Sequence, residues 1–227
     1  MNRVKSFRII TITLLVLATV LYLVYAYLFP NPSLEMQAHD NSGLQADTIV
    51  GVSGQSISDM TGMHGSYVSV ADSSELFFVN GSSSGTTGKF KDFKVTISTD
   101  GPLESVQIEA VIESKSVYTF NEIRDSHLQD EDFFNTKNFP MISFQSTKIE
   151  QTDTAYLAMG SMQFLGVENE IVLPFKYLGS AIYPEGNVYH VLEGGFIFNP
   201  GDYGMDVGLT IADVSEVKFH LEVEELK

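Results

Sequence analysis

The sequence of 227 residues predicts an all-β domain, an antiparallel barrel or sandwich of about eight strands, preceded by a single N-terminal transmembrane helix. Three observations lead to this prediction. Hydrophobic residues recur with a period of two from about residue 66 onward, turn signals separate the alternating segments, and one long apolar run lies near the N-terminus. The chain therefore divides into residues 1–29, 30–65 and 66–227, of which the last is the folded domain.

The first of these segments contains an uncharged run, residues 9–29. As a helix this run would span about 31 Å, which matches the hydrocarbon core of a bilayer. Arg3, Lys5 and Arg8 precede it, so the N-terminus is expected to stay in the cytoplasm. A cleaved signal peptide is the main alternative and a buried core helix a lesser one, but signal peptides have shorter apolar cores and small residues at the cleavage point. We interpret residues 1–29 as a cytoplasmic basic stub and single-pass membrane anchor, which places the rest in the periplasm or outside the cell.

The second segment, residues 30–65, is rich in Gly, Ser, Asn and Pro, and only Ile49, Val50 and Val52 form an apolar cluster in it. Such a composition is typical of a flexible coil. We therefore expect residues 30–65 to be a linker between the membrane and the domain.

Several segments of the third part alternate between apolar and polar side chains. Phe93, Val95 and Ile97 share one face of a predicted strand, and three further sets do the same: Val106 to Ile112, Ile171 to Tyr177, and Val217 to Val223. This pattern is typical of antiparallel strands with one face in water. A closed barrel would leave no exposed strand edge, whereas a sandwich is the alternative. Pro174 lacks a backbone donor, so its position should face an edge or a gap.

One stretch, residues 118–138, does not alternate. Thr119 to Glu122 has the form of a capping box, which predicts a short helix that ends at about Leu128. Asp130 could then cap a second helical turn.

The composition excludes several classes of protein. A net charge of −16 repels phosphate backbones, so we expect no nucleic-acid partner. The absence of Cys excludes disulfides, thiolate metal sites and thiol nucleophiles. The glycine-rich run 81–89 lacks the spacing of a phosphate-binding loop, and the five histidines lack zinc-site spacing. We expect neither a metal nor a catalytic site.

Arg124, Asp125 and His127 are the one place in the sequence where Arg, Asp and His cluster. Beside a capped helix they favour a structural or rim-forming ion-pair network, with contact to a ligand head group and acid–base catalysis as the alternatives. A Gly-x-Ser-x-Gly nucleophile motif does not occur, so no hydrolase nucleophile can be named.

The feature that points to a function is the large number of aromatic and other apolar side chains at strand positions. These side chains could fill a barrel or surround one apolar ligand, and periodicity leaves both alternatives open. The candidate ligand-binding residues are Phe90, Phe93, Val95, Phe144, Met159, Met162, Phe164, Phe175, Tyr177, Phe196, Phe198 and Tyr203.

Several motifs occur in a fixed order and spacing: Ser116-Val117-Tyr118-Thr119, Arg124-Asp125-Ser126-His127-Leu128, Asp132-Phe133-Phe134-Asn135 and Phe139 to Thr147. Together with Gly88 to Phe90, Gly160 to Phe175 and Asp202 to Met205, they resemble the signature of YceI-like proteins over about residues 66–226. The resemblance implies a lipocalin-like antiparallel barrel, exported by bacteria, whose apolar tunnel holds a polyisoprenoid or isoprenoid quinone. It implies no established enzymatic activity.

This chain departs from that pattern at two places. Gly166-Val167 leads into Glu168-Asn169-Glu170 where relatives usually carry a basic element, and Pro200 stands where an Arg commonly precedes the late turn. We therefore favour a neutral isoprenoid or quinone over a prenyl phosphate.

The leading hypothesis is a non-enzymatic, membrane-tethered, exported barrel that holds an apolar isoprenoid-type lipid and needs no other cofactor. A homodimer is a further expectation. The alternatives are a protein-interaction module with a filled barrel core and an enzyme that uses Arg124, Asp125 and His127.

Overall fold

The computed structural model describes residues 58–81, 86–183, 186–206 and 214–226. The predicted membrane anchor and most of the predicted linker lie outside these residues. None of the helices among the described residues is long and apolar enough to cross a bilayer.

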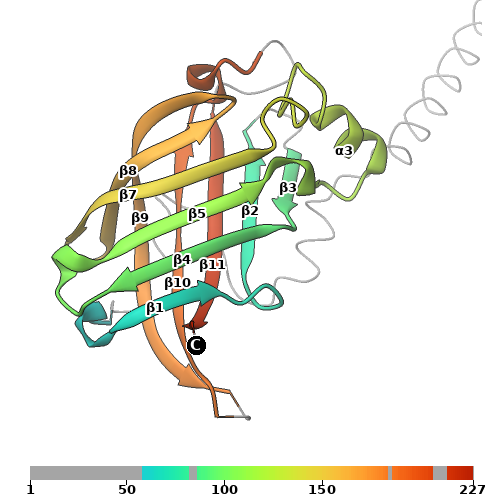
Figure 1. Ribbon diagram of the computed structural model, residues 1–227. Coiled ribbons are helices and arrows are strands. Elements are labelled where there is room, and N and C mark those ends of the chain that lie inside the picture. The colour runs from blue at the N-terminus through green and yellow to red at the C-terminus, as the bar shows by residue number, and fades with distance from the viewer. Residues whose placement is uncertain (1–57, 82–85, 184–185, 207–213, 227) are drawn as a thin grey trace, which may run out of the picture. The chain divides into compact units, whose positions relative to one another are not determined.

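The described strands form one antiparallel sheet with the order β1-β4-β5-β7-β8-β9-β10-β11-β2-β3-β6, and β1 also pairs with β11 (Figure 1). The pairing of β1 with β11 closes the sheet into a barrel. The strands are β1 (Gly65–Ser69), β2 (Glu75–Asn80), β3 (Thr86–Phe90), β4 (Phe93–Thr99), β5 (Gln107–Glu113), β6 (Val117–Tyr118), β7 (Met141–Gln151), β8 (Tyr156–Phe164), β9 (Val167–Ile182), β10 (Val188–Phe198) and β11 (Ser215–Glu225).

Three pairs of consecutive strands each act as one bent barrel strand. β1 and β2 both pair with β11, and the hairpin partners of these two segments are β4 and β3. β5 and β6 in turn pair with β4 and β3. The described strands thus form an eight-stranded meander in which each barrel strand pairs with its neighbours in the chain, and this confirms the predicted antiparallel barrel of about eight strands.

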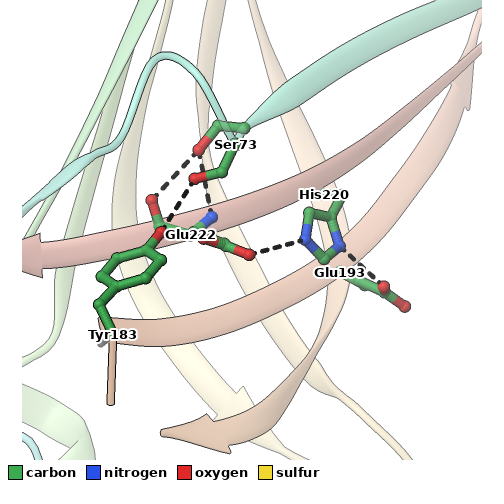
Figure 2. A network of polar contacts seen from close by, with 6 residues as sticks. Ser73, Tyr183, Glu193, His220 and Glu222 are labelled. Carbon is green, nitrogen blue, oxygen red and sulfur yellow. Dashed lines mark hydrogen bonds and ion pairs between the residues drawn. The ribbon is translucent and has the colours of Figure 1, made fainter. Parts of the chain in front are cut away.

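The bend between β1 and β2 lies against β11 at Glu222. The backbone N–H of Val70 donates to the Glu222 carbonyl (2.8 Å), and the Ser74 hydroxyl bonds both the N–H and the carbonyl of Glu222 (3.1 Å each). On the outer face of this seam, Tyr183 donates to the Glu222 carboxylate and also contacts the Ser73 hydroxyl (3.2 Å; Figure 2). These bonds close the barrel where the strand bends.

The non-alternating segment contains the helix α3 (Glu122–Leu128), which ends where the sequence predicts. Its N-cap is Asn121 rather than Thr119, because the Asn121 side chain accepts from the backbone N–H groups of Ile123 and Arg124. The stretch after Asp130 forms hydrogen-bonded turns instead of a second helix.

The end of the predicted linker belongs to the folded part. Residues Met60–Gly62 form the short 3-10 helix η1, and the side chains of Met60 and Met63 are each 1% exposed. The linker boundary placed at residue 65 is therefore too late in the chain. Two apolar residues three positions apart, which meet on one side of a helical turn, explain why residues 58–64 pack against the barrel.

The β9–β10 ladder ends at the pair Phe175 and Gly194, so residues 167–174 of β9 bond only to β8 and residues 195–198 of β10 bond only to β11. Pro174 lies at the point where the ladder stops, as its missing donor led us to expect. The 3-10 helix η4 (Pro200–Tyr203) contacts β9 here, and the Asn169 amide donates to the Asp202 carbonyl (3.2 Å).

A second break lies between β5 and β7, whose ladder ends at the pair Glu109 and Gln145. Here the 3-10 helix η2 (Leu103–Ser105) contacts β7, and the N–H of Ile108 donates to the buried Ser146 hydroxyl (2.8 Å). Each break in the ladder is thus covered by a short helical turn.

Candidate functional site: the barrel interior

Eleven of the twelve predicted ligand-binding residues belong to the apolar interior. Eight are 8% exposed or less: Phe90, Val95, Phe144, Met162, Phe164, Phe175, Tyr177 and Tyr203. Phe93, Phe196 and Phe198 are partly buried and pack against them. The strands therefore bring together nearly the whole candidate set.

Met159 is the exception. It alternates along β8 with the buried residues Ala158 and Gly160, and successive side chains of a strand point to opposite faces. Met159 consequently lies on the outer face of the barrel, whereas Met162, three positions later, lies inside.

One end of the interior is an aromatic cluster, which we call the phenylalanine end. Neighbouring rings in it have centroids 5.5–6.3 Å apart, within the range at which aromatic side chains attract one another. Its members come from four strands, from the turn after α3 and from η4: Phe78, Phe90, Phe134, Phe164, Phe198 and Tyr203. Apart from the Tyr203 hydroxyl, the six side chains of this cluster are hydrocarbon.

The Tyr203 hydroxyl is the polar atom of that end. Tyr203 is 3% exposed, and its hydroxyl is the one buried side-chain polar atom among the described residues that lacks a hydrogen-bond partner. The side-chain amide of the nearby Asn169 donates to the Asp202 carbonyl. Asn169 also lowers the pKa of Tyr203 and so opposes the larger effect of burial. Burial raises the pKa of Tyr203, so the hydroxyl stays protonated and keeps a proton to donate.

The opposite end of the interior, which we call the methionine end, consists of Met60, Met63, Tyr67, Tyr156 and Tyr177. Tyr156 is fully buried; its hydroxyl accepts from the N–H of Met60 (3.1 Å) and donates to the Ser58 carbonyl (3.1 Å). The Tyr67 hydroxyl likewise bonds the N–H and the carbonyl of His64 (3.2 and 3.0 Å). Two tyrosine hydroxyls thus hold the segment 58–64 in place.

A histidine lies beside this end. The Tyr177 hydroxyl is 2.7 Å from Nδ1 of His190, and the His190 ring packs edge-on against Tyr67 at a centroid distance of 4.9 Å. Burial lowers the pKa of His190 and raises that of Tyr177, so both groups are neutral near pH 7. Their hydrogen bond uses the polar atom that Tyr177 would otherwise present to the interior.

Arg124 and Asp125 both bond to Thr119, whereas His127 does not join them. The Asp125 carboxylate accepts from the N–H and the hydroxyl of Thr119, and Arg124 donates to the hydroxyl and the carbonyl of the same residue (2.7 and 2.6 Å). His127 is exposed on α3. This arrangement favours the structural interpretation of the cluster, because Arg124 and Asp125 fix the chain where it enters α3.

The described residues contain no group of His, Asp or Glu side chains arranged to hold a metal ion. Among the described residues, the interior presents apolar side chains and the one unpaired hydroxyl of Tyr203, so its contacts suit apolar groups, from the protein itself or from an apolar molecule.

Sequence reasoning missed Met60, Met63, Phe134 and His190 as interior or near-interior residues. Met60 and Met63 lie in a Gly- and Ser-rich stretch, and their spacing after Asp59 is the signal that could have identified a helical turn. Phe134 lies in the non-alternating segment, where periodicity gives no orientation. His190 follows the alternation that places Leu192 inside.

Known proteins match this chain in sequence. A family model described as the YceI-like domain matches residues 67–223. A UPF0312 protein of Photorhabdus laumondii is 31% identical over 101 residues, which cover 44% of this chain and 52% of the relative, so the match spans about half of that relative. A UPF0312 protein of Pseudomonas paraeruginosa is 28% identical over 141 residues, which cover 62% of this chain and 73% of the relative.

Solved structures match the fold. BcnA of Burkholderia cenocepacia has a TM-score of 0.61 at 18% identity and covers 68% of this chain and 98% of its own. A mutant of the YceI protein of Campylobacter jejuni has a TM-score of 0.56 at 26% identity, with coverages of 63% and 86%. A polyisoprenoid-binding domain from Saccharophagus degradans has a TM-score of 0.55 at 18% identity, with coverages of 70% and 98%.

The family model covers more than half of the chain, the barrel has the fold of the solved relatives, and the matched region includes at least part of each of the eight barrel strands. The chain belongs to the YceI-like family.

Proposed function

We propose that this protein binds an apolar lipid of the isoprenoid type, an isoprenoid or isoprenoid quinone, inside its barrel. The observation that carries the proposal is the interior itself, in which side chains from every barrel strand form one continuous apolar cluster between the two ends. A chain of isoprene units is stabilised by such contacts, since each methylene removed from water contributes about 0.8 kcal/mol to the free energy of binding. The related domain of Saccharophagus degradans, described as polyisoprenoid-binding, supports the same ligand class.

The charges around the phenylalanine end favour a neutral ligand over a prenyl phosphate. Glu168 and Glu170 are exposed at the start of β9, Asp202 is exposed on η4, and Arg124 is bonded to Thr119. An anionic head group placed here would be repelled by these carboxylates.

The protein acts, in this proposal, as a binding protein without enzymatic activity. It is anchored by residues 9–29 with the barrel in the periplasm or outside the cell, so that the barrel takes its ligand from the adjacent bilayer. Protease treatment of spheroplasts, whose outer layers have been opened, tests the location, because digestion of the barrel without rupture of the cytoplasmic membrane is expected. Protection of the barrel in spheroplasts with an intact cytoplasmic membrane would contradict export. Sedimentation of the purified chain tests the predicted homodimer.

Binding is tested with the delipidated full-length chain and a ubiquinone of defined chain length. Saturable uptake of one quinone per chain is expected. A Phe164→Ala variant should weaken it, because Phe164 contacts the rings of Phe134, Phe198 and Tyr203. Met141→Ala is the matched control, since Met141 lies on the outer face of β7 and is 47% exposed. No uptake, or equal loss in both variants, would contradict a site inside the barrel.

The second candidate function is an interaction module with a filled core. The contacts among the interior rings favour it, because rings in direct contact need no ligand to satisfy them. In that case the chain excludes the quinone, and crosslinking in cells recovers a protein partner instead.

A further inference from the structure

We propose that Met60 and Met63 are the closed end of the lipid site: the terminal isoprene units of the bound chain pack against these side chains, and the oxygen-bearing end lies at Tyr203. This inference rests on the proposed function and adds the orientation of the ligand and a limit on its length.

The segment 58–64 packs against the barrel. Its backbone is tied to the barrel by the hydroxyls of Tyr156 and Tyr67 and by the bond from the Ser58 N–H to the Tyr177 carbonyl (2.8 Å). The family match begins at Tyr67, so this segment precedes the shared barrel. Met60 and Met63 are nevertheless part of the same apolar cluster as the inward residues of the strands.

At the methionine end, each of the three tyrosine hydroxyls already has a hydrogen-bond partner within the protein. The hydroxyls of Tyr67 and Tyr156 are bonded to the segment 58–64, and that of Tyr177 is bonded to His190. What remains to face the interior is thioether and hydrocarbon, and a polar ligand atom buried there would lose its hydrogen bonds to water without replacement. Methionine is also flexible and adapts to the irregular outline of a branched chain. This end therefore suits the hydrocarbon terminus of the ligand.

The phenylalanine end has the opposite property. The buried Tyr203 hydroxyl has no partner among the described residues, and an unpaired buried donor is unfavourable. A carbonyl or hydroxyl oxygen of a quinone or prenol would accept its proton. Tyr203 also lies on η4, beside the break in the β9–β10 ladder, where a ligand end can be accommodated without breaking strand hydrogen bonds.

The length of the interior follows from β8, which begins at Tyr156 in the methionine end and finishes at Phe164 in the phenylalanine end. This strand is about 26 Å long, and with the tilt of barrel strands it spans roughly 20 Å of the axis, enough for about four extended isoprene units. A longer chain in the same extended conformation would not fit between Met63 and Tyr203.

The test uses the full-length wild-type chain and a short-chain quinone that carries a diazirine on its terminal isoprene unit. After illumination, we expect peptide mass spectrometry to find the label on residues 58–64 and on Tyr156. A label concentrated on Phe78, Phe90 or Phe134 would overturn the proposed orientation while leaving lipid binding intact. No uptake of the probe would overturn both the inference and the proposed function.

A variant provides an independent measurement. Met60→Ala together with Met63→Ala removes about six heavy atoms, roughly the volume of one isoprene unit. In a series of ubiquinones, the longest chain that binds tightly should therefore gain one unit, with roughly a tenfold improvement for that chain relative to wild type. Met141→Ala should leave the series unchanged. If the double variant folds and its preference for quinone length is unchanged, Met60 and Met63 are not the closed end of the site. If the double variant does not fold, the labelling of the wild-type chain decides the matter.

Discussion

The two ends of the barrel solve the problem of buried polar atoms in opposite ways. At the methionine end, the hydroxyl of the fully buried Tyr156 is bonded to two backbone groups of the segment 58–64. At the phenylalanine end, the hydroxyl of Tyr203, which is 3% exposed, has no partner among the described residues. A satisfied hydroxyl holds the structure together, whereas an unsatisfied one is available to a ligand. The methionine end therefore stabilises the fold, whereas the phenylalanine end has a hydroxyl that can donate a hydrogen bond to a polar ligand atom.

The largest expected effect is the loss of core volume at either end. Phe164→Ala should lower the free energy of unfolding by about 3–5 kcal/mol and Met63→Ala by about 2–5 kcal/mol, because each leaves a cavity among buried neighbours. Chemical denaturation measures both values. A change of less than about 0.5 kcal/mol for Met63→Ala, the size expected at an exposed site such as Met141, would show that the segment 58–64 does not pack against the barrel.

A smaller effect is expected where the chain enters α3 at the phenylalanine end. Asp125→Ala removes the acceptor of the Thr119 N–H and hydroxyl, and Thr119 is fully buried, so the free energy of unfolding should fall by about 2–3 kcal/mol. His127→Ala, on the exposed side of the same helix, should change it by less than about 0.5 kcal/mol. An equal loss in both variants would contradict the structural role assigned to Asp125. A loss of lipid binding on His127→Ala alone would favour contact with a head group.

The two tyrosines give the most direct contrast between the ends. Tyr156→Phe should lower the free energy of unfolding by about 1–3 kcal/mol, because the N–H of Met60 loses its acceptor. Tyr203→Phe removes a hydroxyl without a partner and should leave the stability of the lipid-free chain unchanged or slightly raised. The same substitution should weaken binding of a quinone but not of squalene, a hydrocarbon without oxygen. If Tyr203→Phe destabilises the chain as much as Tyr156→Phe, the difference between the ends is lost.

The smallest effects are expected at two histidines, His190 and His220, whose pKa values shift in opposite directions. Burial lowers the pKa of His190 at the methionine end below its ordinary value of 6.5, so the unfolded state takes up the proton first and His190 reduces stability as the pH falls below about 6.5. On the outer face, the hydrogen bond that His220 Nδ1 donates to the Glu193 carboxylate (2.9 Å; Figure 2) raises the pKa of His220 above that value. Glu222 and Glu75 add to the rise, and burial opposes it. Stability from His220 is therefore present below about pH 6.5 and is lost as the pH rises through its folded pKa.

Urea midpoints between about pH 5 and pH 8 for His190→Gln and His220→Gln measure these contributions. Each should be under about 1 kcal/mol, since partial exposure screens the charges. His190→Gln should flatten the acid side of the profile, whereas His220→Gln should lower stability mainly at acid pH. The same sign for both variants would contradict the opposite environments of the two rings.

Alternating side chains predicted the antiparallel strands and an architecture of about eight of them, because a strand with one buried face leaves a period of two in the sequence. The choice of a barrel over a sandwich came from the resemblance to YceI-like proteins, and the edge or gap at Pro174 came from the backbone donor that proline lacks. The bend at residues 70–74 breaks that period, and its closure depends on bonds to Glu222, far away in the chain. Met159 and Met162 are an odd number of positions apart and so lie on opposite faces of β8, which the sequence alone could have indicated. Met60 and Met63 could not be identified from composition, because their burial depends on the hydroxyls of Tyr156 and Tyr67.

The mass of the intact full-length protein, released gently from the membranes of its native host, tests lipid binding most directly. Native mass spectrometry should show the chain with one bound molecule of isoprenoid mass, released on denaturation, and the Met141→Ala variant should retain it. A chain that carries the mass of its polypeptide alone, together with an interior that excludes added quinone, would contradict lipid binding in the barrel.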